Sequence, residues 1–371
     1  MISYNFPIWK GALDNAPENV TPHNFSIDQN SNGLIQQTKE NKIIKNIVEG
    51  YSLDEYNFIT SPPGFSDWAT KIGEQYKYYI NEHVKSFKNF DILEVGGGSD
   101  FFGIEAVNNG ANSYTIIDPA MDKSDSKKIR IIKDYFGEQT TFNKQFDLIL
   151  SLNTIEHVPN PFDFMLGISK NLKSNGICIL IYPDIKNQFL KGDFNALIHE
   201  HFNYFTLESS RMLFEKTGFK ITNHFSSEDT FYFCLQNFKT TTNETNCNQT
   251  ELLDKTKIAL DNNLKYFVER VKYATQKGKV GLHGCCAGLN NLIYLSSIND
   301  DRNIYLFDGD ISKKGKYISS SKKNIKHTNH PEYSNMDFIF VAAMTFYDDI
   351  KRFAVQNSGI DENHILPIYP F

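Results

Sequence analysis

The chain has 371 residues, of which 40% are hydrophobic. This length predicts two or three domains, because single cores rarely grow past roughly 250 to 300 residues. Its formal net charge is −6 and no basic block stands out along it, which argues against nucleic acid or an anionic membrane as a partner.

Targeting and redox signals are weak throughout the chain. It contains no run of eighteen apolar residues, and its first residues lack the basic and apolar regions of a signal peptide, so a cytoplasmic location is expected. The cysteines lack metal-ligand spacing, and reduced thiols are the simplest account of them. They are Cys178, Cys234, Cys247, Cys285 and Cys286.

Residues 1–88 predict a small helical N-terminal region. Helical periodicity is clear only in 41–48 and 68–87. Between them, residues 61–68 read as a rigid turn tipped with aromatic side chains. This turn is either a lid over a pocket or part of a helical subdomain packed on the edge of a sheet.

The most informative stretch is the apolar run 91–95, which stops at Gly96-Gly97-Gly98 and is followed by an amphipathic segment, 101–109. This pattern predicts a buried strand that turns sharply into a helix, with glycines where a ligand approaches the backbone. The next expected strand, 113–117, runs into Asp118. An acid at that place usually holds a ribose, so the stretch predicts a nucleoside site.

The identity of the nucleoside follows from Glu94 and from the glycine spacing. The third glycine of the dinucleotide fingerprint is missing, and its place is polar. Glu94, two residues before Gly96, adds a carboxylate that suits the cationic sulfonium of S-adenosylmethionine better than a pyrophosphate. The pattern Glu94-x-Gly96-x-Gly98, with Asp118 twenty-four residues after Glu94, resembles motif I and the ribose acid of class I S-adenosylmethionine methyltransferases.

Strands and helices alternate from about residue 89 to 239, which predicts a doubly wound α/β sheet. An apolar strand over 147–152 leads into Asn153 and His157, and a helix is expected from Pro161 to Gly176. Because ligands bind past the carboxyl ends of such strands, Asn153 and His157 are expected beside Gly96. His157 is either a site histidine or a structural one.

A further acid, Asp134, follows the short Ile-rich run after Asp118. In class I methyltransferases a polar or acidic residue at this place contacts the adenine amine. Asp134 is therefore the candidate for that contact, with an ordinary surface acid as the alternative.

The second informative stretch contains His199, Glu200 and His201. Two imidazoles and a carboxylate could bind a metal, but they lack the spacing of a zinc helix, so no metal site is expected. Proton transfer suits them better, because imidazole titrates near neutral pH. Thr206 is then expected to cap a helix.

The C-terminal third predicts a second α/β module. A polar linker and a long helix occupy 240–278, and 279–371 alternates strands with a glycine-containing turn, 284–288, and an acid, Asp308, after the next strand. This module is either a holder for a nucleotide, which the resemblance described next makes that of an activated sugar, or a purely structural domain. The predicted fold class is therefore α/β, with a Rossmann-like class I methyltransferase sheet, a second Rossmann-like domain and a helical N-terminal region.

Several segments together resemble the C-methyltransferases that act on nucleotide-linked keto-sugars. They are Glu94-x-Gly96, Asn175-Gly176 before a strand that ends in Pro183, and the segment from Phe194 through His199-Glu200-His201 to Tyr204-Phe205-Thr206, followed by the C-terminal module. The resemblance covers roughly residues 90–371. Two departures stand out: no cysteine precedes Cys178, so the zinc module of the family is absent or replaced, and Ile198 replaces a tyrosine.

The resemblance implies S-adenosylmethionine as the cofactor and a sugar or sugar nucleotide as the substrate. We expect His201 to act as the base that removes a proton next to a keto group, with Glu200 orienting it or binding a sugar hydroxyl and His199 as a second-choice partner. The near alternative is a sugar O-methyltransferase. Alternatives from other classes are a nicotinamide-dependent oxidoreductase that uses residues 284–288, and a binding protein without activity.

Overall fold

The structure, a computed structural model, describes residues 1–38, 43–51, 67–124, 126–227, 229–238 and 247–370. The chain divides into two compact units: 1–27, 187–199 and 250–371 form one, and 28–186 with 200–249 form the other. We call them the C-terminal unit and the central unit. The expected linear domains, 1–88, 89–239, 240–278 and 279–371, differ from this division, because residues 1–27 and 187–199 pack with the C-terminal sheet.

The central unit is built on a seven-stranded sheet in the order β10-β11-β8-β7-β4-β5-β6. β4 to β8 run parallel, whereas β11 pairs antiparallel with β8 and β10 antiparallel with β11. In chain order the strands are β4 (Asp91–Val95), β5 (Ser113–Ile117), β6 (Ile129–Ile132), β7 (Phe146–Leu152), β8 (Leu172–Pro183), β10 (Phe219–Ser227) and β11 (Thr230–Asn237). The doubly wound α/β sheet expected from the sequence is confirmed.

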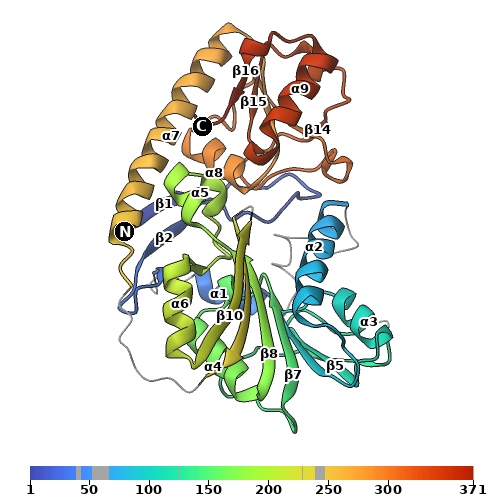
Figure 1. Ribbon diagram of the computed structural model, residues 1–371. Coiled ribbons are helices and arrows are strands. Elements are labelled where there is room, and N and C mark those ends of the chain that lie inside the picture. Colours follow the sequence, from blue (N-terminus) through green and yellow to red (C-terminus); the bar gives the residue numbers. More distant parts are fainter. Residues whose placement is uncertain (39–42, 52–66, 125, 228, 239–246, 371) are drawn as a thin grey trace. The chain divides into compact units, whose positions relative to one another are not determined.

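Helices cover both faces of this sheet (Figure 1). α2 (Asp67–His83) and α3 (Phe101–Asn108) pack on one face, against side chains such as Ile92 and Ile116. α4 (Pro161–Asn171) and α6 (Leu207–Lys216) pack on the other, against Leu93 and Ile149. Because successive side chains of a strand point to opposite faces, neighbouring residues such as Ile92 and Leu93 enter different cores.

Capping residues set the ends of two of these helices. The side chain of Asn160 accepts a hydrogen bond from the Asp163 amide, with Pro161 at the first helical position. Thr206 and Ser209 form a reciprocal capping box at the start of α6. The prediction that α4 extends to Gly176 is wrong: it ends at Asn171, because Leu172 already has extended backbone and begins β8.

The N-terminal region is not only helical, as the sequence suggested. The two expected helices are present as α1 (Ile43–Tyr51) and α2, but strands β1 (Ile2–Phe6), β2 (His23–Gln29) and β3 (Ile35–Gln37) precede them. β1 pairs antiparallel with β2, and β3 pairs antiparallel with β9 (Asn203–Tyr204). Most of the turn over 61–68, proposed as a lid, lies outside the described residues.

The C-terminal unit contains the second Rossmann-like module. Its five strands are all parallel, in the order β14-β13-β12-β15-β16, with helices packed beside them (Figure 1). Its further elements are α5 (Lys186–Lys191), α7 (Thr250–Lys277), β12 (Val280–His283), α8 (Ala287–Leu295), β13 (Ile304–Asp308), β14 (Ile325–His327), β15 (Phe338–Val341), α9 (Tyr347–Ser358) and β16 (Ile365–Pro367).

Among the described residues, no helix combines the length and the apolar character needed to cross a lipid bilayer. The longest helix, α7, instead buries one stripe of its surface, which includes Leu253, Leu260, Phe267 and Val271, as its periodicity predicts.

Candidate active site

The glycine turn after β4 has one closed side and one open side. Gly96 and Gly98 both have positive φ, 72° and 61°, which L side chains rarely adopt. A Cβ on Gly96 would lie 2.4 Å from the side chain of Thr154, whereas a Cβ on Gly98 would meet nothing within 4 Å. The turn is therefore packed against the end of β7 at Gly96 and open for a ligand at Gly98.

Asp118 lies at the carboxyl end of β5 and bonds to this turn. One of its carboxylate oxygens accepts the amide N–H of Gly98 at 3.0 Å and the other accepts the N–H of Ala120 at 2.7 Å. The side chain is largely buried, with 7% exposure. The sequence prediction that Asp118 and the glycine turn lie together is thus confirmed.

Glu94 does not present an open carboxylate to a ligand. Its side chain is 1% exposed and accepts a hydrogen bond from the hydroxyl of Tyr114 at 2.7 Å. Burial, with the nearby charges of Asp118 and Asp100, raises its pKa to about 8. A buried, protonated carboxyl group that supports the turn differs from the sulfonium partner expected from the sequence, because β4 places this residue inside the fold.

Asn153 ends β7 in a left-handed conformation, with φ of 51°. Its side-chain amide donates to the hydroxyl of Tyr76 on α2 at 2.9 Å, and its backbone N–H donates to the carbonyl of Ile181. The hydroxyl of Thr154 in turn lies 3.3 Å from the carbonyl oxygens of Val95 and Gly96. The ends of β4 and β7 are therefore joined at the place where the sequence expected the site.

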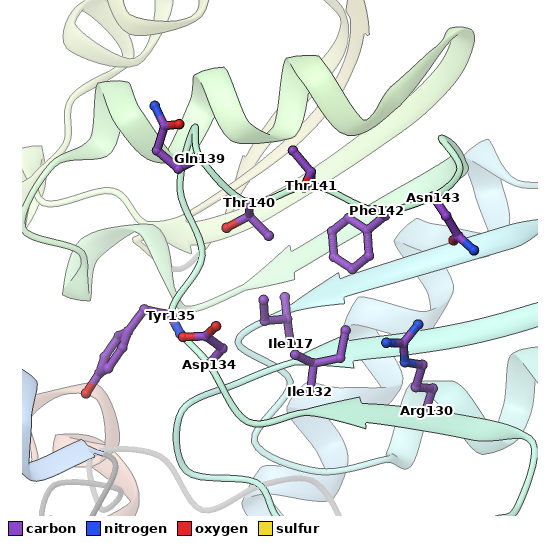
Figure 2. A pocket seen from close by; sticks show the side chains of 10 residues that line it. All are labelled: Ile117, Arg130, Ile132, Asp134, Tyr135, Gln139, Thr140, Thr141, Phe142 and Asn143. Carbon is purple, nitrogen blue, oxygen red and sulfur yellow. The ribbon is translucent and has the colours of Figure 1, made fainter.

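Asp134 lies in a different setting, on the wall of a groove of about 670 Å³. Figure 2 shows Asp134 at one end of the groove and Arg130 at the other, with Ile117 and Ile132 between them. The Asp134 side chain is exposed and accepts the N–H of Tyr135 at 2.8 Å. Nothing in this geometry opposes a contact with adenine, and the assignment stays a prediction.

The histidine cluster forms where the chain after β7 meets the segment before β9. The rings of His157 and His201 lie edge to face, with centroids 4.9 Å apart and an interplanar angle of 83°. The buried carboxyl group of Glu156 lies beside them, 3.8 Å from Nε2 of His157. The backbone N–H of Phe202 donates to the carbonyl of Glu156 at 2.7 Å, which ties the two segments together.

The tautomer of His157 follows from its partner. Nδ1 of His157 lies 3.0 Å from the carbonyl oxygen of Glu200, which can only accept, so Nδ1 carries the proton and Nε2 is left as an acceptor. Glu200 thus contributes its backbone carbonyl to His157. The sequence had expected its carboxylate to orient His201 or to bind a sugar hydroxyl.

Burial sets the charge of this cluster. It lowers the pKa of His157 to about 4, and burial together with His157 lowers the pKa of His201 well below its usual value of 6.5. Burial also raises the pKa of Glu156 to about 8. At neutral pH both imidazoles are therefore uncharged, and an uncharged imidazole can accept a proton.

His199 has a different environment, in the C-terminal unit. Its ring packs edge-on against Phe6 and Phe25, with centroid distances of 4.7 and 5.6 Å, and its side chain is 1% exposed. Burial lowers its pKa to about 4. Such packing is that of a core histidine, so the structure gives little support to His199 as a second-choice catalytic partner.

Comparisons with known proteins identify the central sheet. Residues 69–224 match the family described as "Methyltransferase domain". We call residues 69–224 the methyltransferase domain after the family that they match, and the cofactor that this match supports is S-adenosylmethionine. The methyltransferase domain contains Asp118 at the end of β5, Asn153 and His157 after the end of β7, and His201 shortly before β9.

Individual relatives match only parts of the chain. A ubiquinone biosynthesis O-methyltransferase of Rickettsia bellii is 32% identical over 114 residues, which are 28% of this chain and 47% of that protein. The C-methyltransferase NovU of Streptomyces niveus is 28% identical over 76 residues, 20% of this chain and 18% of that protein. A structure described as a putative S-adenosylmethionine-dependent methyltransferase from Listeria monocytogenes has 14% identity and a TM-score of 0.38, covering 46% of this chain and 99% of that one. The chain thus spans less than half the length of the curated relatives it matches.

The open side of the glycine turn fits the cofactor of the methyltransferase domain. The space at Gly98 and the carboxylate of Asp118 lie together, as a nucleoside with a ribose requires. Gly96, Gly98, Asp118 and Asn153 are the residues that would hold S-adenosylmethionine, with Asp134 as the adenine candidate. The cofactor, when bound, supplies a methyl group activated by a sulfonium.

The cluster beside the methyltransferase domain's turn could also hold a metal ion by distance alone. One ligand atom each from Glu156, His157 and His201 lies within 4.8 Å of the others. Glu156 was not singled out from the sequence. The sequence signal for Glu156 was its position directly before His157 and shortly after an apolar strand. In a parallel sheet, residues past the carboxyl end of a strand lie where ligands bind.

Proposed function

We propose that the chain transfers the methyl group of S-adenosylmethionine to a sugar or nucleotide-linked sugar, at a carbon next to a keto group, with His201 as the base. The observation that carries this proposal is the pair of uncharged imidazoles of His157 and His201, on the ligand side of a methyltransferase sheet. The sequence resemblance to keto-sugar C-methyltransferases includes His201 itself.

The proposed chemistry assigns separate tasks to the cluster. His201 accepts the proton next to the keto group, because its low pKa keeps the imidazole uncharged at neutral pH. His157, fixed by the Glu200 carbonyl, presents Nε2 toward the cluster. The protonated carboxyl group of Glu156 supplies an uncharged acid beside both rings. Such a group can stabilise developing negative charge without adding a charge of its own.

The test is methyl transfer from isotopically labelled S-adenosylmethionine to a nucleotide-linked 4-keto-sugar, with the product examined by NMR. A new methyl group on the ring carbon next to the keto group supports the proposal. Label that appears only on oxygen, or no transfer to any keto-sugar, contradicts it. A sugar already reduced at that keto carbon is the matched control, since its neighbouring proton is not acidic.

A second candidate, O-methylation of a sugar hydroxyl, is favoured by two observations. Ile198 stands where the C-methyltransferases have a tyrosine, and the ubiquinone biosynthesis relatives are O-methyltransferases. The same histidine would serve as the base, without the need to stabilise an enolate. The position of the label in the NMR test separates the two candidates.

A rival from another class, a nicotinamide-dependent oxidoreductase or an inactive nucleotide-sugar-binding protein, is tested by calorimetry. We expect S-adenosylmethionine to bind and NAD not to. Tight binding of NAD without binding of S-adenosylmethionine would overturn the proposed function.

A further inference from the structure

The glycine turn of the second Rossmann-like module is occupied by the chain itself. The backbone N–H of Gly288, in the first turn of α8, donates to Oδ1 of Asn195 at 2.8 Å. A Cβ on Gly288 would lie 2.8 Å from that same side chain. Asn195 therefore sits on the helix N-terminus, where a nucleotide phosphate would be bound in a Rossmann module.

Asp308, the acid that would hold a ribose in this module, already has hydrogen-bond partners within the fold. The carboxylate of Asp308 accepts the N–H groups of Cys285 and Asp310, each at 2.9 Å, and the ammonium group of Lys313 at 2.9 Å. The first two bonds match those of Asp118 in the methyltransferase domain. Lys313 has no counterpart at Asp118 among the described contacts, and it neutralises the carboxylate within the fold.

Two more asparagines of the same unit hold the segment on either side of Asn195. The side-chain amide of Asn291, on α8 and 1% exposed, donates to the carbonyl oxygens of Phe194 and Leu197 at 3.2 and 2.9 Å. The amide of Asn263, on α7, donates to those of Lys191 and Gly192 at 2.7 and 2.9 Å. Buried carbonyl groups of an irregular segment need such partners, so these bonds fix its path.

The backbone of this segment is also shaped to fit α7. Gly192 has φ of 65°, and a Cβ there would lie 2.5 Å from the backbone carbon of Ala259. The ring of Phe194 packs against Tyr4, with centroids 5.8 Å apart. Residues 191–197 thus follow a defined course through hydrogen bonds, close backbone packing and an aromatic contact, all within the C-terminal unit.

We propose that the second Rossmann-like module is a holder for residues 191–197 and not a nucleotide site, and that Asn195, Asn263 and Asn291 are positioning residues for the catalytic segment. The held segment continues directly into His199, Glu200 and His201. Fixing it limits the conformations open to the residues that follow. This inference rests on the proposed role of His201.

The decisive variant is Asn291→Asp, which keeps the size of the side chain but places a second oxygen against the carbonyls of Phe194 and Leu197. The matched control is Asn303→Asp, because the Asn303 amide donates to the carbonyl of Thr275 in the same module, away from the held segment. Asn195→Ala is the milder second variant, since Asn195 is only half-buried.

Three measurements on the full chain decide the outcome. We expect faster hydrogen exchange in peptides covering 193–201, and kcat lowered about tenfold to a hundredfold with unchanged affinity for S-adenosylmethionine, because a misplacement of about 1 Å can cost 10²-fold. The control should change neither. If both Asn291→Asp and Asn195→Ala have the same hydrogen-exchange rates and the same kcat as the control, the proposal is overturned.

Nucleotide binding gives an independent check. The wild-type chain, titrated with uridine diphosphate, thymidine diphosphate and NAD, should show no binding that depends on this module. Binding that is lost in Lys313→Gln would overturn the inference. The exchange measurement does not depend on turnover: if His201→Gln is fully active, the proposed function fails while faster exchange still supports the holder.

Discussion

The imidazole rings of His157 and His201 lie edge to face at 83°, with Nδ1 of His157 bonded to the carbonyl of Glu200, the residue directly before His201. One histidine therefore braces the segment that carries the other. The two rings therefore pack together but have different roles. His157 is fixed by a hydrogen bond to the backbone, whereas His201 is the proposed base.

Replacing His201 by Gln should lower turnover roughly 10²- to 10⁴-fold, the usual contribution of a general base. The affinity for S-adenosylmethionine, measured by calorimetry, should stay the same, because the cofactor residues lie at the ends of β4, β5 and β7. His199→Gln is the control: its ring packs against Phe6 and Phe25, so we expect a lower melting temperature with kcat largely kept. Normal turnover in His201→Gln with an inactive His157→Gln would move the base to the end of β7.

The wild-type rate should fall on the acidic side only well below pH 6.5. Burial lowers the pKa of His201, so the imidazole stays uncharged, and competent as a base, to lower pH than a free histidine. The pH profile of kcat/KM measures this directly. The acidic limb should disappear from the residual rate of His201→Gln, and a limb above pH 6.5 in the wild type would contradict the assignment.

Replacing Asp118 by Asn should weaken S-adenosylmethionine binding by on the order of 1.5 to 3 kcal/mol for each lost hydrogen bond to a charged group. The change keeps the shape of the side chain, although its single oxygen can accept only one of the two N–H groups, from Gly98 and Ala120, that the carboxylate accepts. Asp134→Asn is the comparison, with a smaller loss expected because Asp134 is exposed. Calorimetry that finds unchanged affinity in Asp118→Asn would place the ribose elsewhere.

Glu94→Gln should become more stable relative to the wild type as pH rises from 4.5 to 8. The folded chain keeps the Glu94 proton up to about pH 8, whereas the unfolded chain releases it near pH 4.5. The wild-type protein therefore loses stability between these pH values, and the Glu94→Gln variant does not. The slope approaches about 1.4 kcal/mol per pH unit. Urea unfolding of both proteins without cofactor measures it, and parallel curves would show that Glu94 is ionised in the fold.

A chelator should leave turnover unchanged, because the proposed chemistry needs no metal. The proximity of Glu156, His157 and His201 makes this a necessary test. The measurement is the rate after treatment with EDTA and after subsequent addition of zinc. Loss of activity that zinc restores would contradict this prediction and would identify the cluster as a metal site.

Local patterns allowed much of the methyltransferase domain to be predicted. Apolar runs that stop at glycine, acid or asparagine gave β4, β5 and β7 within a residue, and Asn160-Pro161 gave the start of α4. The strands before α1 were missed, because short segments such as Ile2–Phe6 gain their stability from pairing with residues far along the chain.

The roles of the two adjacent histidines could not be separated from the sequence. His199 and His201 stand two residues apart in one segment, yet one packs with Phe6 and Phe25 and the other with His157. Those partners are 44 to about 190 positions away in the chain, and no local pattern encodes them. The same holds for Asn195 and Gly288, whose contact decides how the second module is interpreted.

The most direct test of the central claim is deuterium exchange into a nucleotide-linked 4-keto-sugar, followed by NMR in deuterated water with the full chain and S-adenosylhomocysteine. We predict that the wild type incorporates deuterium at the carbon next to the keto group and that His201→Gln does so roughly 10²-fold or more slowly. Exchange at the same rate in both proteins, or no deuterium incorporation with the wild type, would contradict carbon methylation with His201 as the base.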